Sequence, residues 1–340
     1  GRWYDNDVDK HDANLFARAN WQVTDGLRLF GDLQYRYVSY RTWGVNDNYV
    51  SEEVGMQPID VDKQYHFFNP RAGVSYTLAE RNNFYLSFAV AQKEPTRSDF
   101  TDRYKFAADD SYPSSEKLYD WELGYAYTAP RLSLGVNLYY MKYKDQLVPT
   151  GMVNDDSNAL NTNVPDSYRR GVELSASWRA TGWFTVGANA TFSQNRIENY
   201  VDALKDSPTY GKELGDMTIA YSPDVIANAF LNFHHRGFEA VFHTQHVGKQ
   251  YFTNNENDAL SLDAYCVTNL NLAYTFRTRS ARSVRLGLLI NNLFNAEYES
   301  NGYGYSYMDT WSGPAPVRID EAYYFPQAPL NVLANVTVKF

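Results

Sequence analysis

The residues of this chain that could carry chemistry occur as pairs in polar segments. Adjacent carboxylates stand at several positions, among them Glu52-Glu53, Asp109-Asp110 and Asp155-Asp156. Two carboxylates in one cleft can act as acid and base, or can hold a cation. All three pairs lie in segments that we predict to be loops, where a solvated surface charge is the ordinary role. The carboxylates therefore do not define a catalytic site.

The histidines and the single cysteine give no stronger indication of catalysis. His234 and His235 are adjacent, and His243 and His246 differ by three positions, so on strands the members of each pair point to opposite faces. Neither pair is well placed to share a metal ion. Cys266 is the only cysteine, which excludes an internal disulfide and disfavours a structural zinc site. With no nucleophile-elbow sequence either, we expect no catalytic residue, no metal site and no cofactor, and hence no enzyme.

Aromatic residues are better candidates for binding. Residues 301–311 read NGYGYSYMDTW, and this segment cannot bury all its rings within one loop. Tyrosine spaced by glycine is a composition typical of adaptable binding surfaces. We therefore predict a ligand-binding role for Tyr303, Tyr305, Tyr307 and Trp311. The alternatives are that these rings pack against neighbouring loops, lie at a membrane interface, cover the mouth of a barrel or contact a surface partner such as a lipoprotein.

Composition narrows the class of protein. The net charge of −9 argues against nucleic acid as a partner. No run of about eighteen apolar residues occurs, so no membrane helix is expected, but a barrel strand needs only one apolar face. The aromatic content of 16%, with 29 tyrosines, suits rings at two membrane interfaces and in external loops.

Residues 328–340, APLNVLANVTVKF, show a strand pattern that recurs throughout the chain. Apolar residues occupy every second position and polar residues most of the others, which predicts one apolar and one polar face. The same alternation recurs at 14–23, 27–43, 63–78, 84–92, 118–128, 132–146, 168–180, 184–196, 225–234, 238–251, 264–276 and 284–294. The sequence therefore predicts about thirteen strands.

The connections between these strands indicate a membrane barrel. Tight turns alternate with long polar segments that we predict to be loops, such as 46–62, 148–165 and 295–322, with residues 1–10 also a loop. Short turns at one end and long loops at the other are typical of transmembrane barrels. An open sheet would leave unpaired edges in lipid, and bacterial barrels have even strand numbers. We therefore predict an all-β transmembrane antiparallel β-barrel, of which residues 1–340 are the C-terminal part.

The alternation also assigns faces and one register. Across the turn at 236–237, Leu231 should face Phe242, and Phe233 should face Ala240. The residues predicted to face lipid are Leu134, Val136, Leu174, Leu231, Leu286, Leu288, Val332 and Val336. The residues predicted to face the lumen are Asn137, Glu173, Asn232, Asn291 and Asn335. Glycines on the inward rows (Gly135, Gly171, Gly187 and Gly287) suggest open space, or another piece of chain packed close.

Several motifs resemble one family. Asn291–Tyr298, NNLFNAEY, is similar to the NLF(D/N)xxY segment of TonB-dependent outer-membrane transporters, which leads from the penultimate strand into the last external loop. Glu94–Phe100, EPTRSDF, and Pro113–Gly124, PSSEKLYDWELG, resemble that family's mid-barrel (R/E)-x-P box and its following strand. Gly171–Leu174, GVEL, resembles a common strand start, and Phe340 a terminal aromatic assembly signal. The sequence as a whole is most similar to that of the Bacteroidetes type of these transporters.

The resemblance implies a 22-stranded barrel in the outer membrane of a Gram-negative cell, filled by an N-terminal plug and driven through a TonB box by the inner-membrane energy complex. This chain would supply roughly the last thirteen strands, lining the lumen and carrying external loops, beside the lipid bilayer. The implied cargo is a scarce ligand such as a ferric siderophore, a cobamide or an oligosaccharide. Arg97, in the mid-barrel box, is a secondary ligand-binding candidate. The haem-receptor subgroup carries a histidine between its mid-barrel boxes, and residues 95–118 contain none.

Two other functional classes stay open at this point. One is a passive porin or adhesion barrel without a plug. The other is an outer-membrane enzyme, whose barrel would be smaller and would carry a nucleophile or a carboxylate pair near its outer rim. A plug domain with a TonB box in the parent reading frame would distinguish the transporter from both.

Overall fold

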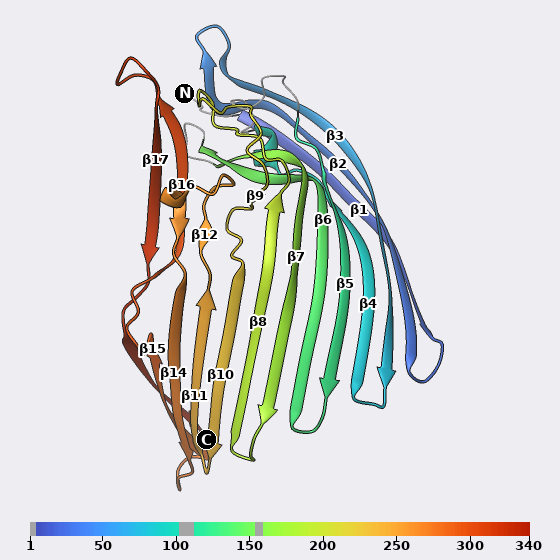
Figure 1. Ribbon diagram of the computed structural model, residues 1–340, viewed down its shortest axis with the longest axis vertical. Helices are drawn as coiled ribbons and strands as arrows, with labels where there is room; N and C mark the ends of the chain where they lie inside the picture. The colour runs from blue at the N-terminus through green and yellow to red at the C-terminus, as the bar shows by residue number, and fades with distance from the viewer. Residues whose placement is uncertain (1–4, 102–111, 154–158) are drawn as a thin grey trace.

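The computed structural model describes residues 5–101, 112–153 and 159–340, and these form one curved antiparallel sheet with additions at its upper end (Figure 1). Thirteen strands follow one another in chain order, with β1 and β18 at the two edges, so the predicted strand number is confirmed. Within the described ranges, no helix is long and apolar enough to cross a bilayer. The strands of the sheet are β1 (Asp5–Gln22), β2 (Leu27–Ser51), β3 (Gly55–Leu78), β4 (Asn82–Lys93), β5 (Glu116–Thr128), β6 (Leu132–Val153), β7 (Ala159–Arg179), β8 (Phe184–Ile197), β10 (Val225–His235), β11 (Phe238–Val247), β14 (Tyr265–Phe276), β15 (Ser283–Asn291) and β18 (Asn331–Lys339).

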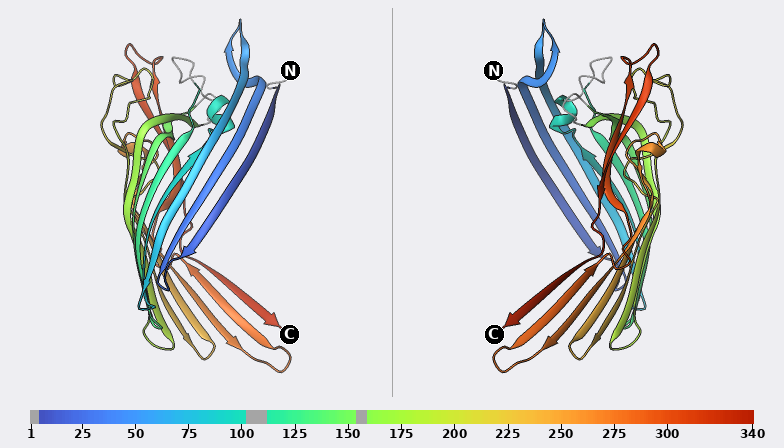
Figure 2. Two further views of the ribbon diagram at one scale, coloured as in Figure 1. Left: turned by 90° about the vertical axis from the view of Figure 1, so that its right-hand side faces the viewer. Right: turned by 90° about the vertical axis from the view of Figure 1, so that its left-hand side faces the viewer.

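Smaller elements lie outside this order. They are α1 (Arg97–Thr101), the short strand β9 (Met217–Thr218) paired with β8, the pair β12 (Gln250–Tyr251) and β13 (Ser261–Leu262), a 3₁₀ turn at Asp258–Leu260, and the hairpin of β16 (Glu299–Asp309) and β17 (Val317–Pro326). The side views show that the sheet is bent into a trough, with the loops and the hairpin gathered at one end (Figure 2).

Cross-strand pairing separates an apolar face from a polar one. One row of directly paired residues crosses seven strands, and all of its members are apolar: Trp178, Val186, Leu231, Phe242, Leu270, Ile290 and Val332. Leu231 pairs with Phe242 and Phe233 with Ala240, as predicted. On the other face Asn137 pairs with Glu173 and donates a hydrogen bond to it over 3.2 Å. A one-residue slip would exchange the two faces, so this segregation fixes the register.

In the described residues, the predicted loops at 1–10, 46–62, 148–165 and 295–322 are largely strands, so those predictions were wrong there; residues 1–4 and 154–158 lie outside the described residues. β1 begins at Asp5, β2 and β3 are joined only by residues 52–54, and β6 and β7 continue to Val153 and from Ala159. These extensions project beyond the part of the sheet that has an apolar face. Their apolar residues, such as Val61 and Val148, pack in small clusters with neighbouring segments and not along one continuous apolar face. The regular alternation that marks a strand in the sequence is therefore lost, while the backbone ladder continues.

The inward glycines do not mark empty space. A Cβ added to Gly187 would lie 2.4 Å from the ring of Phe230, its directly paired neighbour on β10. At Gly171 the nearest atoms are the Phe192 carbonyl oxygen at 2.4 Å and the Tyr139 hydroxyl at 2.7 Å. Each glycine therefore accommodates a neighbouring side chain that lies across the strand, which weakens the inference that glycine indicates an open lumen.

The NNLF motif lies where the sequence placed it, at the end of the penultimate strand β15. Asn292 has a positive φ of 51° and is only 3% exposed. Its side chain donates to the Ala296 carbonyl oxygen and accepts from the Ala296 N–H, both over 2.8 Å. Asn295 accepts a hydrogen bond from the N–H of Leu330, where the chain returns to β18. The two amides thus close the neck of the segment between β15 and β18.

The face assignment gives a test in the full-length protein. Val136 lies on the apolar face opposite Leu174, and Asn137 on the polar face. Val136→Arg should reduce the free energy of folding into bilayers by about 2–4 kcal/mol, because it places a charge on the lipid side. Asn137→Leu is the matched control and should have little effect. A harmless Val136→Arg together with a disruptive Asn137→Leu would reverse the assignment.

Candidate functional site

The hairpin of β16 and β17 is a separate two-stranded sheet at the loop end of the molecule, above the C-terminal strands of the main sheet (Figure 1). One of its faces packs on a small core made of Phe252, Leu260 and Leu262. Gly302 and Gly304 permit this contact, because a Cβ on either residue would come within 2.7–2.9 Å of the Phe252 ring. The glycines between the tyrosines therefore serve close packing of the hairpin on its base.

The opposite face of the hairpin carries the tyrosines. Alternate residues of a strand point to the same side, so Tyr303, Tyr305 and Tyr307 share this face with Tyr323 and Phe325 of β17. The rings of Tyr303 and Tyr323 stack with centroids 4.9 Å apart and planes 13° from parallel. Tyr305 lies 6.4 Å from both Tyr307 and Tyr323. We call these five residues the tyrosine face.

Glu321 holds three hydroxyl groups of the tyrosine face. It lies directly opposite Tyr305 and accepts hydrogen bonds from Tyr305 over 2.7 Å, Tyr323 over 2.8 Å and Tyr307 over 3.2 Å. The bonds from Tyr305 and Tyr323 lower the pKa of Glu321, so its carboxylate stays ionised. The same carboxylate raises the pKa of Tyr305 well above its ordinary range. The rings are thereby fixed in orientation by a single charged group.

The predicted binding residues are thus only partly brought together. Tyr303, Tyr305 and Tyr307 lie side by side on one surface. Trp311 lies beyond the end of β16, is 81% exposed, and its backbone N–H donates to Asp309 over 2.9 Å. Arg97 lies on α1 and donates to Asn6 of β1, on a different element. The binding role of these residues stays a prediction.

Sequence reasoning missed Glu321 and the aromatic residues of β17. The signal was present in residues 321–325, EAYYF, where Glu321, Tyr323 and Phe325 alternate in the same way as the tyrosines of β16. In the register of the hairpin, which pairs Tyr303 with Tyr323 and Tyr305 with Glu321, the two alternating series lie on one face. The predicted loop at 295–322 does not include this parity.

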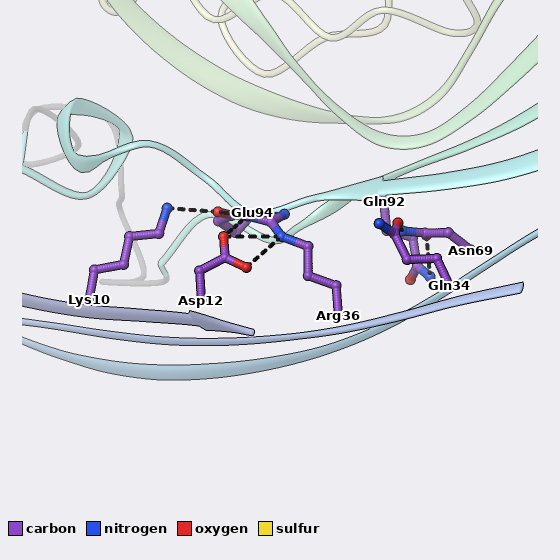
Figure 3. Close-up of polar contacts among 7 residues, drawn as sticks. All are labelled: Lys10, Asp12, Gln34, Arg36, Asn69, Gln92 and Glu94. Carbon is purple, nitrogen blue, oxygen red and sulfur yellow. Dashed lines mark hydrogen bonds and ion pairs between the residues drawn. The ribbon is translucent and has the colours of Figure 1, made fainter. Parts of the chain in front are cut away.

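A second polar cluster surrounds the mid-barrel box at the concave side of the sheet (Figure 3). Arg36 of β2 donates two hydrogen bonds to Glu94, over 2.8 and 2.9 Å, and others to Asp12 of β1. Lys10 of β1 donates to Glu94 over 2.8 Å. Glu94 directly follows β4, so its side chain reaches back across β3 to the first two strands.

This cluster fixes the segment 94–101 over the trough. Phe100 stacks on Tyr40 of β2 with ring centroids 5.5 Å apart. On the other side, Asn161 of β7 donates to Asp99 over 2.8 Å. The segment therefore joins strands that are far apart in the sheet. A relay of amides, Gln34, Asn69 and Gln92, connects β2, β3 and β4 beside it (Figure 3). The box was recognised in the sequence, but its partners were not.

Burial and the neighbouring positive charges shift the pKa of Glu94 in opposite directions. Burial alone would raise its pKa, but the hydrogen bonds from Arg36 and Lys10 outweigh burial and hold the pKa at about 2, below the ordinary value of 4.5. The side chain of Glu94 is 9% exposed and that of Arg36 23%. A charge so covered is stable only with its partners in place.

The trough itself contains a polar recess of about 370 Å³ on β5–β8, lined in part by Glu122, Tyr139, Arg169 and Glu173. Residues 5–101, 112–153 and 159–340 contain no group of three His, Cys, Asp or Glu side chains suited to a metal ion. His243 pairs with Phe230 and His246 with Ala227, on opposite faces. Of the paired carboxylates, Glu52 and Glu53 lie in the exposed β2–β3 turn, while the pairs at 109–110 and 155–156 lie outside the described residues.

The sheet is curved and has an apolar and a polar face. Its strands are extended at one end, and a loop segment folds over its trough. These features define part of the wall of a large β-barrel. The sequence profile of the family described as "TonB dependent receptor-like, beta-barrel" matches residues 1–293. The chain belongs to this family.

Solved structures with the same fold agree. The ferric yersiniabactin uptake receptor FyuA from Yersinia pestis matches with a TM-score of 0.70 and 17% identity, over 98% of this chain and 46% of that one. The siderophore receptor PiuA from Acinetobacter baumannii gives 0.72 and 13%, over 98% and 43%. The copper transporter OprC gives 0.71 and 18%, over 97% and 48%. The chain thus spans about half the length of the structures it matches.

The Arg36 cluster gives a stability prediction. Arg36→Met leaves the covered Glu94 carboxylate with Lys10 alone and should weaken the attachment of residues 94–101 by about 1–3 kcal/mol. Native-state hydrogen exchange of this segment in the full protein measures the effect. Arg18→Met is the matched control, because Arg18 is 66% exposed and forms an ion pair with Asp32 between the same two strands; it should cost about 0–1 kcal/mol. Equal effects would contradict the role of the cluster.

The same cluster predicts a pH dependence. The pKa of Glu94 is lower in the folded protein than its ordinary 4.5, so its contribution to stability is complete above that pH and is lost as pH falls toward about 2. Hydrogen exchange of residues 94–101 should therefore accelerate in this window relative to the β-sheet. Glu94→Gln should abolish the pH dependence. A segment that opens only at alkaline pH would refute this.

Proposed function

We propose that this chain is part of an outer-membrane transporter that imports a scarce ligand with energy delivered by TonB. Membership of the family supports this proposal, and so do the apolar and polar faces of the sheet. In this proposal residues 1–340 are the C-terminal part of the barrel domain. The remaining strands, a plug and the segment that contacts the TonB complex belong to parts of the protein outside this chain. The apolar face contacts the lipid of a Gram-negative outer membrane.

The observation that carries a ligand-binding role is the tyrosine face. Rigid aromatic side chains offer a large contact area at a small entropy cost, and binding energy concentrates in few such residues. Here the rings are oriented by Glu321, and the hairpin is seated on a packed base. We propose Tyr303, Tyr305, Tyr307 and Trp311 as ligand contacts. Arg97 is a secondary contact from the segment over the trough.

The ligand class stays broad in this proposal: a ferric siderophore, a cobamide or an oligosaccharide. Structures of similar fold are named for ferric yersiniabactin uptake and for copper transport, which supports a metal-chelate cargo over a sugar. A surface lipoprotein that contacts the hairpin is the alternative role for the tyrosine face. The two roles differ in whether hairpin variants change ligand affinity.

Energy coupling is tested in cells that express the full-length protein. Uptake of a panel of ferric siderophores, cobamides and oligosaccharides should be lost when TonB is deleted, while the protein still assembles in the outer membrane. Passive entry that is independent of TonB would instead indicate a porin. A heat-modifiable gel mobility shift checks assembly in both strains.

The ligand-contact proposal gives a prediction for the same protein. Simultaneous replacement of Tyr303, Tyr305 and Trp311 by alanine should weaken ligand binding by more than about 2 kcal/mol, because aromatic contacts dominate such sites. Tyr210→Ala is the control: Tyr210 is 48% exposed and lies on a different external segment. Unchanged affinity in an assembled triple variant would remove the hairpin from the ligand site.

A further inference from the structure

Glu321 is bound by hydroxyl groups and not by a basic side chain. Its two carboxylate oxygens accept from Tyr305, Tyr323 and Tyr307. Among the residues that the structure describes, no lysine or arginine lies within the 4.0 Å of an ion pair to it. Other partly covered carboxylates do have such a partner, as Glu94 has Arg36. The negative charge of Glu321 is therefore shared only with the tyrosines.

The nearest basic residue along the strand is engaged elsewhere. Arg318 has the opposite parity to Glu321, so it lies on the packed face of the hairpin. There its guanidinium donates to Asp320 over 2.9 Å and to Ser306 over 3.0 Å. The positive charge of Arg318 thus lies on the packed face of the hairpin, and the negative charge of Glu321 lies on the tyrosine face.

The tyrosine face presents ring surfaces rather than hydroxyl groups. Three of its hydroxyls are already donated to Glu321, while Tyr303, Tyr323 and Tyr307 remain 45%, 44% and 36% exposed. The face of an aromatic ring attracts a cation through its quadrupole. A hydroxyl that donates to an anion polarises its ring further in the same sense. The net charge of −9 adds a long-range attraction for cations.

We propose that the tyrosine face binds a cationic group of the ligand, an ammonium, quaternary ammonium or guanidinium, over its rings with Glu321 as the counter-charge. This inference rests on the proposed function in that it assigns the hairpin to the ligand site. Glu321 acts in two ways: it orients Tyr305, Tyr307 and Tyr323, and it supplies the charge. A neutral ligand group of the same shape gains only the contact with the rings.

A pair of probes separates charge from shape. Choline and 3,3-dimethylbutan-1-ol have the same size and differ in one positive charge. Binding of each to the full-length protein in detergent is measured by saturation-transfer NMR at low salt. Choline should bind about fivefold more tightly than the neutral probe, as expected for a cation at an exposed aromatic site. Equal affinities, or no binding of choline, would overturn the inference.

Variants test Glu321 through the ratio of the two affinities. Glu321→Gln should lower the preference for choline to the part that the rings alone supply, about twofold, whereas Glu53→Gln, which removes one external carboxylate from the β2–β3 turn, should leave the preference unchanged. A variant in which the hairpin is merely disordered would lose affinity for both probes by the same factor. An equal loss of both probes, or an undiminished preference for choline in Glu321→Gln, would therefore count against the inference.

Failure of the inference can be told apart from failure of the proposed function. If choline is preferred and Glu321→Gln lowers the preference, the cation site stands even where hairpin variants leave uptake unchanged. If the triple aromatic variant loses the transported ligand but the wild type binds both probes equally, the hairpin is a ligand site without cation selectivity, and the inference fails.

Discussion

The rest of the structure depends on the continuous backbone ladder of the antiparallel sheet. In a bilayer every backbone N–H and C=O must find a partner within the protein, and only paired strands provide one throughout. Thirteen strands joined in chain order meet this constraint everywhere except at β1 and β18, the two edges. Our proposal that further strands pair at these edges follows from the same requirement. The ladder also continues beyond the apolar band, which is why β2, β3, β6 and β7 are so long.

The side chains adapt to the ladder in two opposite ways. Where neighbouring side chains are large, glycine makes room, as Gly187 does for Phe230 across the sheet and Gly302 for Phe252 beneath the hairpin. Where the neighbours are charged, one group gathers several partners, as Arg36 does with Asp12 and Glu94, and Glu321 with three tyrosines. Both arrangements fix orientation with few residues. Together with small hydrophobic clusters, such as that of Phe252, Leu260 and Leu262, they explain why the segments outside the apolar band are ordered.

The two clusters occupy the same end of the molecule but have different consequences. The cluster around Glu94 is electrically balanced, with two cations and two anions, and it attaches a segment to the wall. The cluster around Glu321 has no basic member among the described residues, and its rings remain exposed. A balanced cluster mainly stabilises, whereas an unbalanced exposed one attracts a partner of opposite charge. This contrast is why the hairpin, and not the mid-barrel box, is the better ligand candidate.

The sequence alone determined the strand number, the faces, the register at 236–237 and the family motifs, because a strand's alternation is local and a one-residue slip would move every side chain to the wrong face. It could also select Tyr303, Tyr305 and Tyr307 by composition. It could not extend the strands through 46–62 or recognise the separate hairpin within 295–322, since the apolar residues of these segments pack in small local clusters and not on one continuous face. The partners of Glu94 and Glu321 were decided only by tertiary structure. Arg36 lies 58 residues from Glu94 along the chain, and such contacts depend on which strands the sheet places side by side.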